Sequence, residues 1–185
     1  MNTALILIDI QNDYFENGAM KLRGSEAACQ NAKRILNKFR ADDMPLIHIQ
    51  HIANKPNATF FLPNTIGAEI NKELKPLPNE KIIIKHSPNG FKNTELLEYL
   101  NSLNINDLVI CGMMTHMCVD ATTRAAKDYV FNCILIGDAC ATKDLEINGI
   151  VVKAEYVQNS FLSALNYFYS SVKTTNQYLN QTNID

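Results

Sequence analysis

Short, continuous apolar runs alternate with segments of helical periodicity along almost the whole sequence. The runs, which are candidate strands, span residues 3–9, 45–50, 80–85, 107–112 and 131–139, with a shorter edge candidate at 170–175. Because these runs lack the apolar–polar alternation of a half-exposed strand, they indicate strands that are buried on both faces. The pattern predicts an α/β fold, a three-layer α/β/α sandwich whose mostly parallel, Rossmann-like sheet has about six strands.

Helical periodicity fills most of the intervals between the runs. Helices are expected behind a Ser25 cap through Phe39, over residues 67–74, behind a Thr94 cap through Leu103, around Cys118, and over residues 154–168. Strand and helix therefore follow one another in the order that a parallel sheet requires.

Composition limits the classes of protein and of partner. The 185 residues are 46% apolar and 19% charged and contain no linker or repeat, so one domain over residues 1–185 is expected. A net charge of −2 offers no basic surface for nucleic acid. The N-terminal apolar run is short, is interrupted by Asp9 and has no basic leader, so neither a signal peptide nor a membrane partner is expected. The predicted location is cytoplasmic.

The five cysteines are odd in number and form no C-x-x-C pair. This spacing argues against a disulfide framework and against a zinc knuckle, so free thiols are expected.

Three reactive side chains follow apolar strands of the predicted sheet. Asp9 closes the first strand, Lys85 closes the third, and the fourth leads through Gly112 into the helix that carries Cys118. Ligands of such sheets bind outside the carboxyl ends of the strands. A lone cysteine in an apolar helix is more often a small core residue. A thiol beside a cation, a carboxylate and a helix N-terminus, however, is favoured as a nucleophile, and Cys118 combines all three.

Three longer stretches resemble one family. They are "LIDIQNDYF" (7–15), "IIIKHSPNGFKNTELLEYL" (82–100) and "LVICGMMTHMCVDATTRAAKDYVF" (108–131), and the resemblance covers essentially the whole chain. The sequence resembles the isochorismatase-like cysteine hydrolases, which include nicotinamidases and N-carbamoylsarcosine amidases. The resemblance implies a hydrolase of C–N bonds in small molecules and a homo-oligomer, dimeric or tetrameric.

The family's catalytic triad falls on Asp9, Lys85 and Cys118. The resemblance also implies a cis peptide between Met113 and Met114, and an oxyanion hole made by the backbone N–H groups of Met114 and Cys118. In the implied reaction Asp9 is the base, Cys118 attacks the amide carbon to form a thioester, and Lys85 holds both anions.

Departures from the family pattern narrow the function. Nicotinamidases carry a metal-binding D-x-H after the second strand, but His51 and Ala53 stand at those two positions here, so no metal and no other cofactor is expected. Family members that cleave a vinyl ether do not rely on a cysteine nucleophile, so Cys118 favours acyl chemistry. An ester or vinyl ether hydrolase, or a non-catalytic binding or assembly protein, is the alternative.

The substrate pocket is predicted from aromatic and amide side chains. The candidates are Gln11, Phe15, Phe60, Phe61, Asn89 and Phe91. Two or more of the phenylalanines are equally well explained as core residues.

Other polar residues have structural interpretations. Because His48 and His51 are three apart on a strand, their side chains should point to opposite faces, His48 beneath a helix and His51 near the pocket mouth. His86 is expected to make a structural hydrogen bond and His116 to face solvent or another subunit. Asp13 should fix the loop after the first strand, and Arg124 should form an ion pair.

Two other α/β classes fit less well. A phosphoacceptor receiver domain needs an aspartate at the end of the third strand, where Lys85 stands. A dinucleotide-binding domain needs G-x-G-x-x-G after the first strand, where "DIQNDYFENG" stands.

Overall fold

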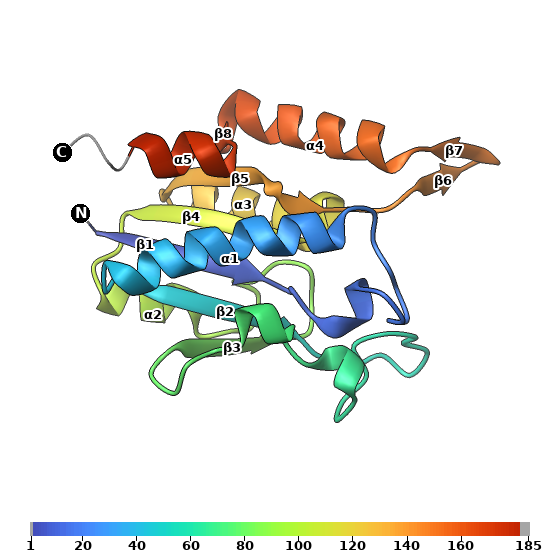
Figure 1. Ribbon diagram of the computed structural model, residues 1–185, viewed down its shortest axis with the longest axis horizontal. Coiled ribbons are helices and arrows are strands. Elements are labelled where there is room, and N and C mark those ends of the chain that lie inside the picture. Colours follow the sequence, from blue (N-terminus) through green and yellow to red (C-terminus); the bar gives the residue numbers. More distant parts are fainter. Residues whose placement is uncertain (1, 182–185) are drawn as a thin grey trace.

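A computed structural model describes residues 2–181 and contains the predicted parallel sheet (Figure 1). The strands of this sheet are β1 (Thr3–Ile8), β2 (Leu46–His51), β3 (Lys81–Lys85), β4 (Asp107–Met113), β5 (Asn132–Ala141) and β8 (Ser171–Lys173). Their order is β3-β2-β1-β4-β5-β8, and every pairing is parallel. The predicted sheet of six strands is confirmed, with the short last strand at the edge.

Strand β1 lies in the middle of the sheet, and its carboxyl end belongs to the edge at which the reactive residues were expected. Five of its six residues are buried, because strands and helices cover it on all sides. The chain moves outward from β1 through β2 to β3, and then returns to the other side of β1 at β4. The carboxyl ends of β1 and β4 therefore flank the switch point at which ligands bind in such sheets.

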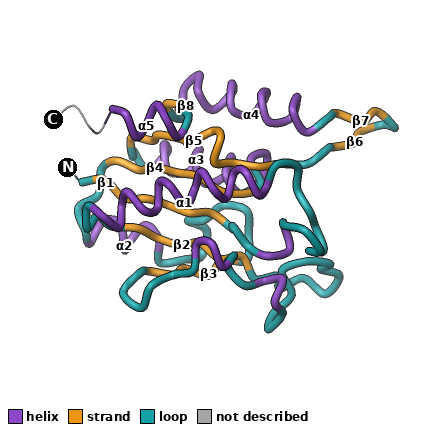
Figure 2. Tube along the Cα trace, in the orientation of Figure 1, coloured by secondary structure: helices purple, strands orange, loops and turns teal. Residues whose placement is uncertain are grey.

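Helices cover both faces of the sheet, as predicted (Figure 2). They are α1 (Ser25–Ala41), α2 (Leu96–Ser102), α3 (Asp120–Asp128), α4 (Ala154–Phe168) and α5 (Thr175–Gln181). In Figure 1, α1 lies in front of the sheet while α2 and α3 lie behind it. Helix α1 packs against α5, and α3 packs against α4. The N-cap of α1 is Gly24, in the left-handed region at φ 73°, and not Ser25, which is the first helical residue.

The helix predicted over residues 67–74 is absent. Two 3-10 turns, η2 (Ile66–Ala68) and η3 (Lys72–Leu74), stand in its place. Between them the backbone is extended, because Asn12 N donates to Glu69 O and Asn71 N donates to Ile10 O. Pairing with the chain after β1 therefore outweighs the local helical pattern. That chain also contains a 3-10 turn, η1 (Asn12–Tyr14).

A small antiparallel hairpin, β6 (Leu145–Ile147) with β7 (Ile150–Val152), was not predicted. Its turn residues Asn148 and Gly149 both have positive φ, 52° and 75°, which is the conformation that an Asn-Gly pair favours. The hairpin projects from the body of the molecule beyond the start of α4 (Figure 1).

All five cysteines are free, as predicted, and all five are buried. Among residues 2–181, no helix is long and apolar enough to cross a membrane.

Candidate active site

Asp9 is the first residue after β1 and is fully buried. Its backbone N–H donates to Ile49 O of the neighbouring strand, and its φ of 50° lies in the left-handed region. Aspartate tolerates this conformation better than most residues do. The turn therefore ends β1 and leaves a carboxylate at the switch point.

Lys85 is the last residue of β3, and its side chain is fully buried. In the parallel register it pairs with His51, the last residue of β2. Paired residues of neighbouring strands point to the same face of a sheet. The register therefore brings the lysine and the histidine together.

Cys118 lies in η4 (Thr115–Val119), a turn of π-helix between β4 and α3, and is 5% exposed. Just before this turn, Gly112 has a φ of 138°, and a Cβ there would meet Ile8 O at 2.1 Å. Only glycine lets β4 approach β1 so closely at this point. The Met113–Met114 peptide is cis, as the resemblance implied.

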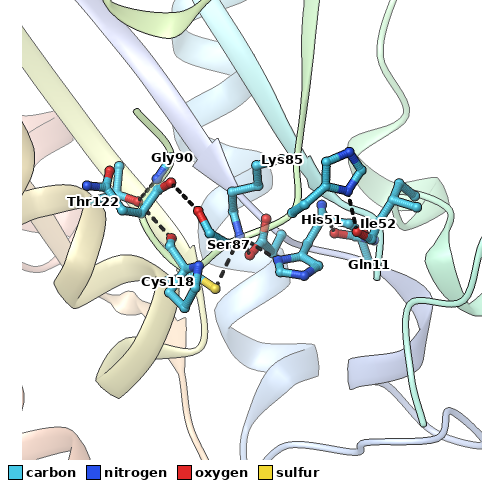
Figure 3. Close-up of polar contacts among 12 residues, drawn as sticks. Gln11, His51, Ile52, Lys85, Ser87, Gly90, Cys118 and Thr122 are labelled. Carbon is cyan, nitrogen blue, oxygen red and sulfur yellow. Dashed lines mark hydrogen bonds and ion pairs between the residues drawn. The ribbon is translucent and has the colours of Figure 1, made fainter. Parts of the chain in front are cut away.

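The side chains of Asp9, His51 and Cys118 surround one atom, Lys85 Nζ (Figure 3). This nitrogen lies 2.6 Å from Asp9 Oδ2, 3.2 Å from Cys118 Sγ and 2.8 Å from His51 Nδ1. In Figure 3 the lysine stands between the sulfur of Cys118 on one side and the ring of His51 on the other. We call Asp9, Lys85 and Cys118, with His51, the buried cluster.

Burial and charge set the protonation states in the buried cluster. Complete burial raises the pKa of Asp9, although Lys85 opposes this rise. Burial also raises the pKa of the Cys118 thiol, and the Asp9 carboxylate raises it further. Burial works against the Lys85 ammonium, but Asp9 and Cys118 outweigh it and raise the pKa of Lys85. At rest, therefore, Lys85 is an ammonium and Cys118 is a thiol, so forming the thiolate requires a base.

Donor atoms of Asp9, His51 and Cys118 lie within 4.8 Å of one another, a spacing that would suit a metal ion. The Lys85 ammonium already contacts each of these three side chains, so an ion would have to displace it.

Gln11 and Asn89, predicted to support or contact the substrate, are engaged with the backbone. Both N–H donors of the buried Gln11 amide are used, by His51 O and Ala68 O, and its oxygen accepts from His51 N. Asn89 Oδ1 accepts from Phe91 N. Gln11 thus clamps the end of β2 to β1, and its geometry fits the supporting role.

The four predicted pocket phenylalanines fall into different places. Phe61 is 1% exposed and packs edge-on against Tyr14, with ring centroids 4.7 Å apart. Phe60 is half-buried against Phe61, at 4.9 Å, and Phe15 is 9% exposed. Phe91 belongs to a separate cluster with Tyr129 and Phe131. Phe61 and Phe91 are thus core residues, and Phe60 is the more exposed ring of the group that it forms with Tyr14 and Phe61.

The remaining polar predictions are mostly confirmed. Asp13 fixes the loop, because its carboxylate accepts from Phe61 N and Ala19 N. Arg124 pairs with Asp120 at 2.9 Å. His86 Nδ1 lies 2.7 Å from Ile52 O.

One histidine prediction is confirmed, and two histidines make contacts that were not predicted. His48 and His51 do point to opposite faces, and His48 is buried against Glu80. His51 is half-buried and reaches Lys85. His116 is half-buried, and its Nδ1 lies 2.5 Å from Thr142 Oγ1.

His51 is the member of the buried cluster that sequence reasoning missed. The sequence carried only a partial signal, a histidine and a lysine near the ends of two predicted strands, and the register that sets them side by side is a property of the fold.

A hollow of about 760 Å³ lies elsewhere, between the start of α1, the end of β5 and the start of α4. Its lining residues include Arg23, Asp138 and Lys153 but no member of the buried cluster.

Comparisons with known proteins match most of the chain to one family. Residues 3–154 match the family model described as the Isochorismatase domain. The isochorismatase family protein YddQ of Bacillus subtilis is 49% identical over 179 residues, which are 97% of this chain and 99% of YddQ. A streptothricin hydrolase of Streptomyces noursei is 30% identical over 77% of this chain and 55% of its own.

A crystal structure of an isochorismatase-type hydrolase from Oleispira antarctica has the same fold. The TM-score is 0.93 at 42% identity, over 97% of this chain and 96% of that one.

Proposed function

Because the chain belongs to the isochorismatase family of hydrolases, we propose that it cleaves an amide-type C–N bond of a small molecule through a cysteine thioester. The observation that carries this proposal is the contact of the buried Lys85 ammonium with both Asp9, at 2.6 Å, and Cys118, at 3.2 Å. A thiol, a carboxylate and a fixed cation are the groups that nucleophilic acyl transfer requires.

The first half-reaction begins with proton transfer from Cys118 Sγ to the Asp9 carboxylate. This step needs a base, since burial holds Cys118 as a thiol. The thiolate then attacks the carbonyl carbon, and the C=O electron pair moves to the oxygen. When the tetrahedral intermediate collapses, the C–N bond breaks, Asp9 returns its proton to the departing nitrogen, and a thioester remains on Cys118.

The second half-reaction uses the same base. Asp9 takes a proton from water, the hydroxide attacks the thioester carbon, and the C–S bond breaks. The proton returns to the sulfur, and a carboxylic acid leaves. Lys85 remains an ammonium throughout, and its charge stabilises the anionic state of Asp9 and of Cys118 in turn.

The developing oxyanion needs donors near the sulfur. We assign this role to the backbone N–H groups of Met114 and Cys118. The Met114 carbonyl accepts from Met117 N and Val119 N, whereas its own N–H has no hydrogen-bond partner among residues 2–181. An unpaired N–H in a residue that is 7% exposed is unusual, and it is available to a ligand. Losing one such donor typically costs about 3 kcal/mol of transition-state stabilisation.

The test is a screen of small amides, read out by release of ammonia or amine and by intact mass after acid quenching. We expect hydrolysis with a transient mass increase on Cys118 that equals the acyl group. Cys118→Ala should lose the acyl adduct and at least roughly 10³-fold in kcat/KM.

Cys133→Ala is the matched control, because Cys133, like Cys118, is a buried free thiol, 6% exposed. It lies on β5, and its Sγ lies near Phe131 O rather than near a member of the buried cluster. The variant should keep the activity and the adduct. Turnover of esters alone would replace the amidase proposal by an esterase, and hydrolysis that survives Cys118→Ala would overturn the thioester route.

A further inference from the structure

One of the contact partners of Lys85, His51, has no role in the proposed reaction. An ammonium has three N–H donors. Lys85 Nζ has three acceptors within reach, Asp9 Oδ2 at 2.6 Å, His51 Nδ1 at 2.8 Å and Cys118 Sγ at 3.2 Å. The contact with Asp9 is an ion pair and the contacts with His51 and Cys118 are hydrogen bonds, and His51 is the one partner that takes no part in bond making or breaking.

We infer that His51 is a positioning residue: its Nδ1 lone pair holds the Lys85 ammonium between Asp9 and Cys118. This inference deepens the proposed function and rests on it for its catalytic meaning. The arrangement itself, a neutral ring accepting from a buried lysine, is independent of the substrate.

The protonation state of His51 supports this role. Burial together with the charges of Lys85 and His86 lowers the pKa of His51 to about 4. At neutral pH the ring is therefore uncharged, and contact with an ammonium requires that Nδ1 be the acceptor and Nε2 carry the proton. The other ionisable groups around it, Asp9 and Cys118, face the same Lys85 nitrogen from β1 and η4.

The ring of His51 is fixed by its surroundings. The buried Gln11 amide holds the His51 backbone on both sides, accepting from its N–H at 2.7 Å and donating to its carbonyl at 2.8 Å. The Phe61 ring packs against the imidazole, with centroids 5.8 Å apart. A fixed acceptor adds a third anchor to the ammonium of Lys85, which Asp9 and Cys118 also hold, and so narrows the positions that its long side chain can take.

Two substitutions of His51 distinguish the effect of losing the hydrogen-bond acceptor from the effect of changing the side-chain volume. His51→Leu fills the space without an acceptor. His51→Asn places an amide oxygen near the position of Nδ1. His86→Leu is the matched control, since His86 is the adjacent exposed histidine and bonds only Ile52 O among residues 2–181. Thermal unfolding checks that each variant folds.

The first measurement needs no substrate: the rate of Cys118 alkylation by iodoacetamide against pH, read by peptide mass. In His51→Leu we expect the profile to move to higher pH, because a less restrained ammonium stabilises the thiolate less. His51→Asn and His86→Leu should remain near the wild-type profile. A His51→Leu profile that matches the wild type, or an Asn variant as shifted as the Leu variant, overturns the inference.

The second measurement uses a substrate found in the amide screen. Losing a group that orients a reactive residue typically costs 10- to 100-fold, so His51→Leu should lower kcat by about that factor and change KM less than about twofold. A change confined to KM would assign His51 to substrate binding and overturn the positioning role. If no amide is hydrolysed while the alkylation profile still depends on His51, the proposed function fails and this inference stands.

Discussion

At the scale of single residues, the surroundings of Cys118 favour the thiol over the thiolate. Many reactive cysteines are thiolates because a cation and a helix N-terminus lower their pKa. Cys118 has the cation, but burial and the Asp9 carboxylate prevail and raise its pKa. The proposed reaction therefore needs Asp9 as its base, and Asp9 lies close enough to share Lys85.

Asp9→Asn should remove the base while keeping the shape of the side chain. We expect kcat/KM to fall about 10²- to 10⁴-fold, the usual contribution of a positioned base. Because Asp9 must be ionised to accept a proton and burial raises its pKa, the acid limb of wild-type kcat/KM should lie above the pH at which an ordinary aspartate titrates. A pH–rate profile measures this, and an acid limb at or below that pH would contradict the assignment.

At the scale of elements, Glu80 joins three segments at the opposite end of the sheet. Its carboxylate accepts from Arg40 of α1 at 2.6 Å and from Leu77 N, and it lies 2.9 Å from His48 Nε2 of β2. Burial opposes the charge, but these donors outweigh it and lower the pKa of Glu80 to about 2. The ionised side chain therefore secures the chain before β3 to helix and sheet.

Glu80→Gln should lower the free energy of unfolding by about 1–3 kcal/mol at pH 7, since buried donors lose a charged partner. The folded pKa lies below the unfolded value of 4.5, so the wild-type advantage is complete above pH 4.5 and fades as pH falls toward 2. Urea unfolding at pH 7 and pH 3 measures the difference.

Glu95→Gln provides the control for Glu80. Its ion pair with Lys81, at 2.8 Å, is exposed, so its loss should change stability by less than about 1 kcal/mol. Equal effects of the two substitutions would mean that the Glu80 network contributes no more than an exposed pair.

At the scale of the whole molecule, large apolar side chains remain exposed at both ends of α4. On the hairpin before its first turn, Ile147 and Ile150 are 66% and 65% exposed, and in its last turn Tyr167 is 91% exposed. Large exposed apolar side chains can mark interaction surfaces. We therefore propose that the chain forms a homo-oligomer through the hairpin and α4.

Sedimentation velocity should give a mass of two or four times 20.8 kDa. The double substitution Ile147→Lys with Ile150→Lys should shift the mass toward one chain, because it places charge on the proposed interface. Ile66 is 76% exposed and lies away from the hairpin, so Ile66→Lys should leave the assembly unchanged. A single-chain mass for the unsubstituted protein across micromolar concentrations would exclude this assembly.

The sequence by itself determined the layers and the reactive edge. Buried strands and amphipathic helices have distinct periods, and the carboxyl ends of parallel strands must share an edge, so Asp9 and Lys85 could be placed near each other before any coordinates were known. Cys118 was a candidate from its place after the fourth strand, and the resemblance to a family supplied the triad roles and the cis peptide. The Asn-Gly turn of the hairpin was present in the sequence as a local signal and was overlooked.

Only the tertiary structure decided what depends on register and on distant backbone pairing. The residues at 67–74 have a helical pattern, but hydrogen bonds to the chain after β1 hold Glu69 and Asn71 extended. His51 joins the buried cluster because β2 and β3 pair in a register that sets it beside Lys85, and a slip of one residue would turn it to the opposite face. The thiol state of Cys118 follows from burial among charges that no local pattern encodes, because desolvation depends on everything packed around the group.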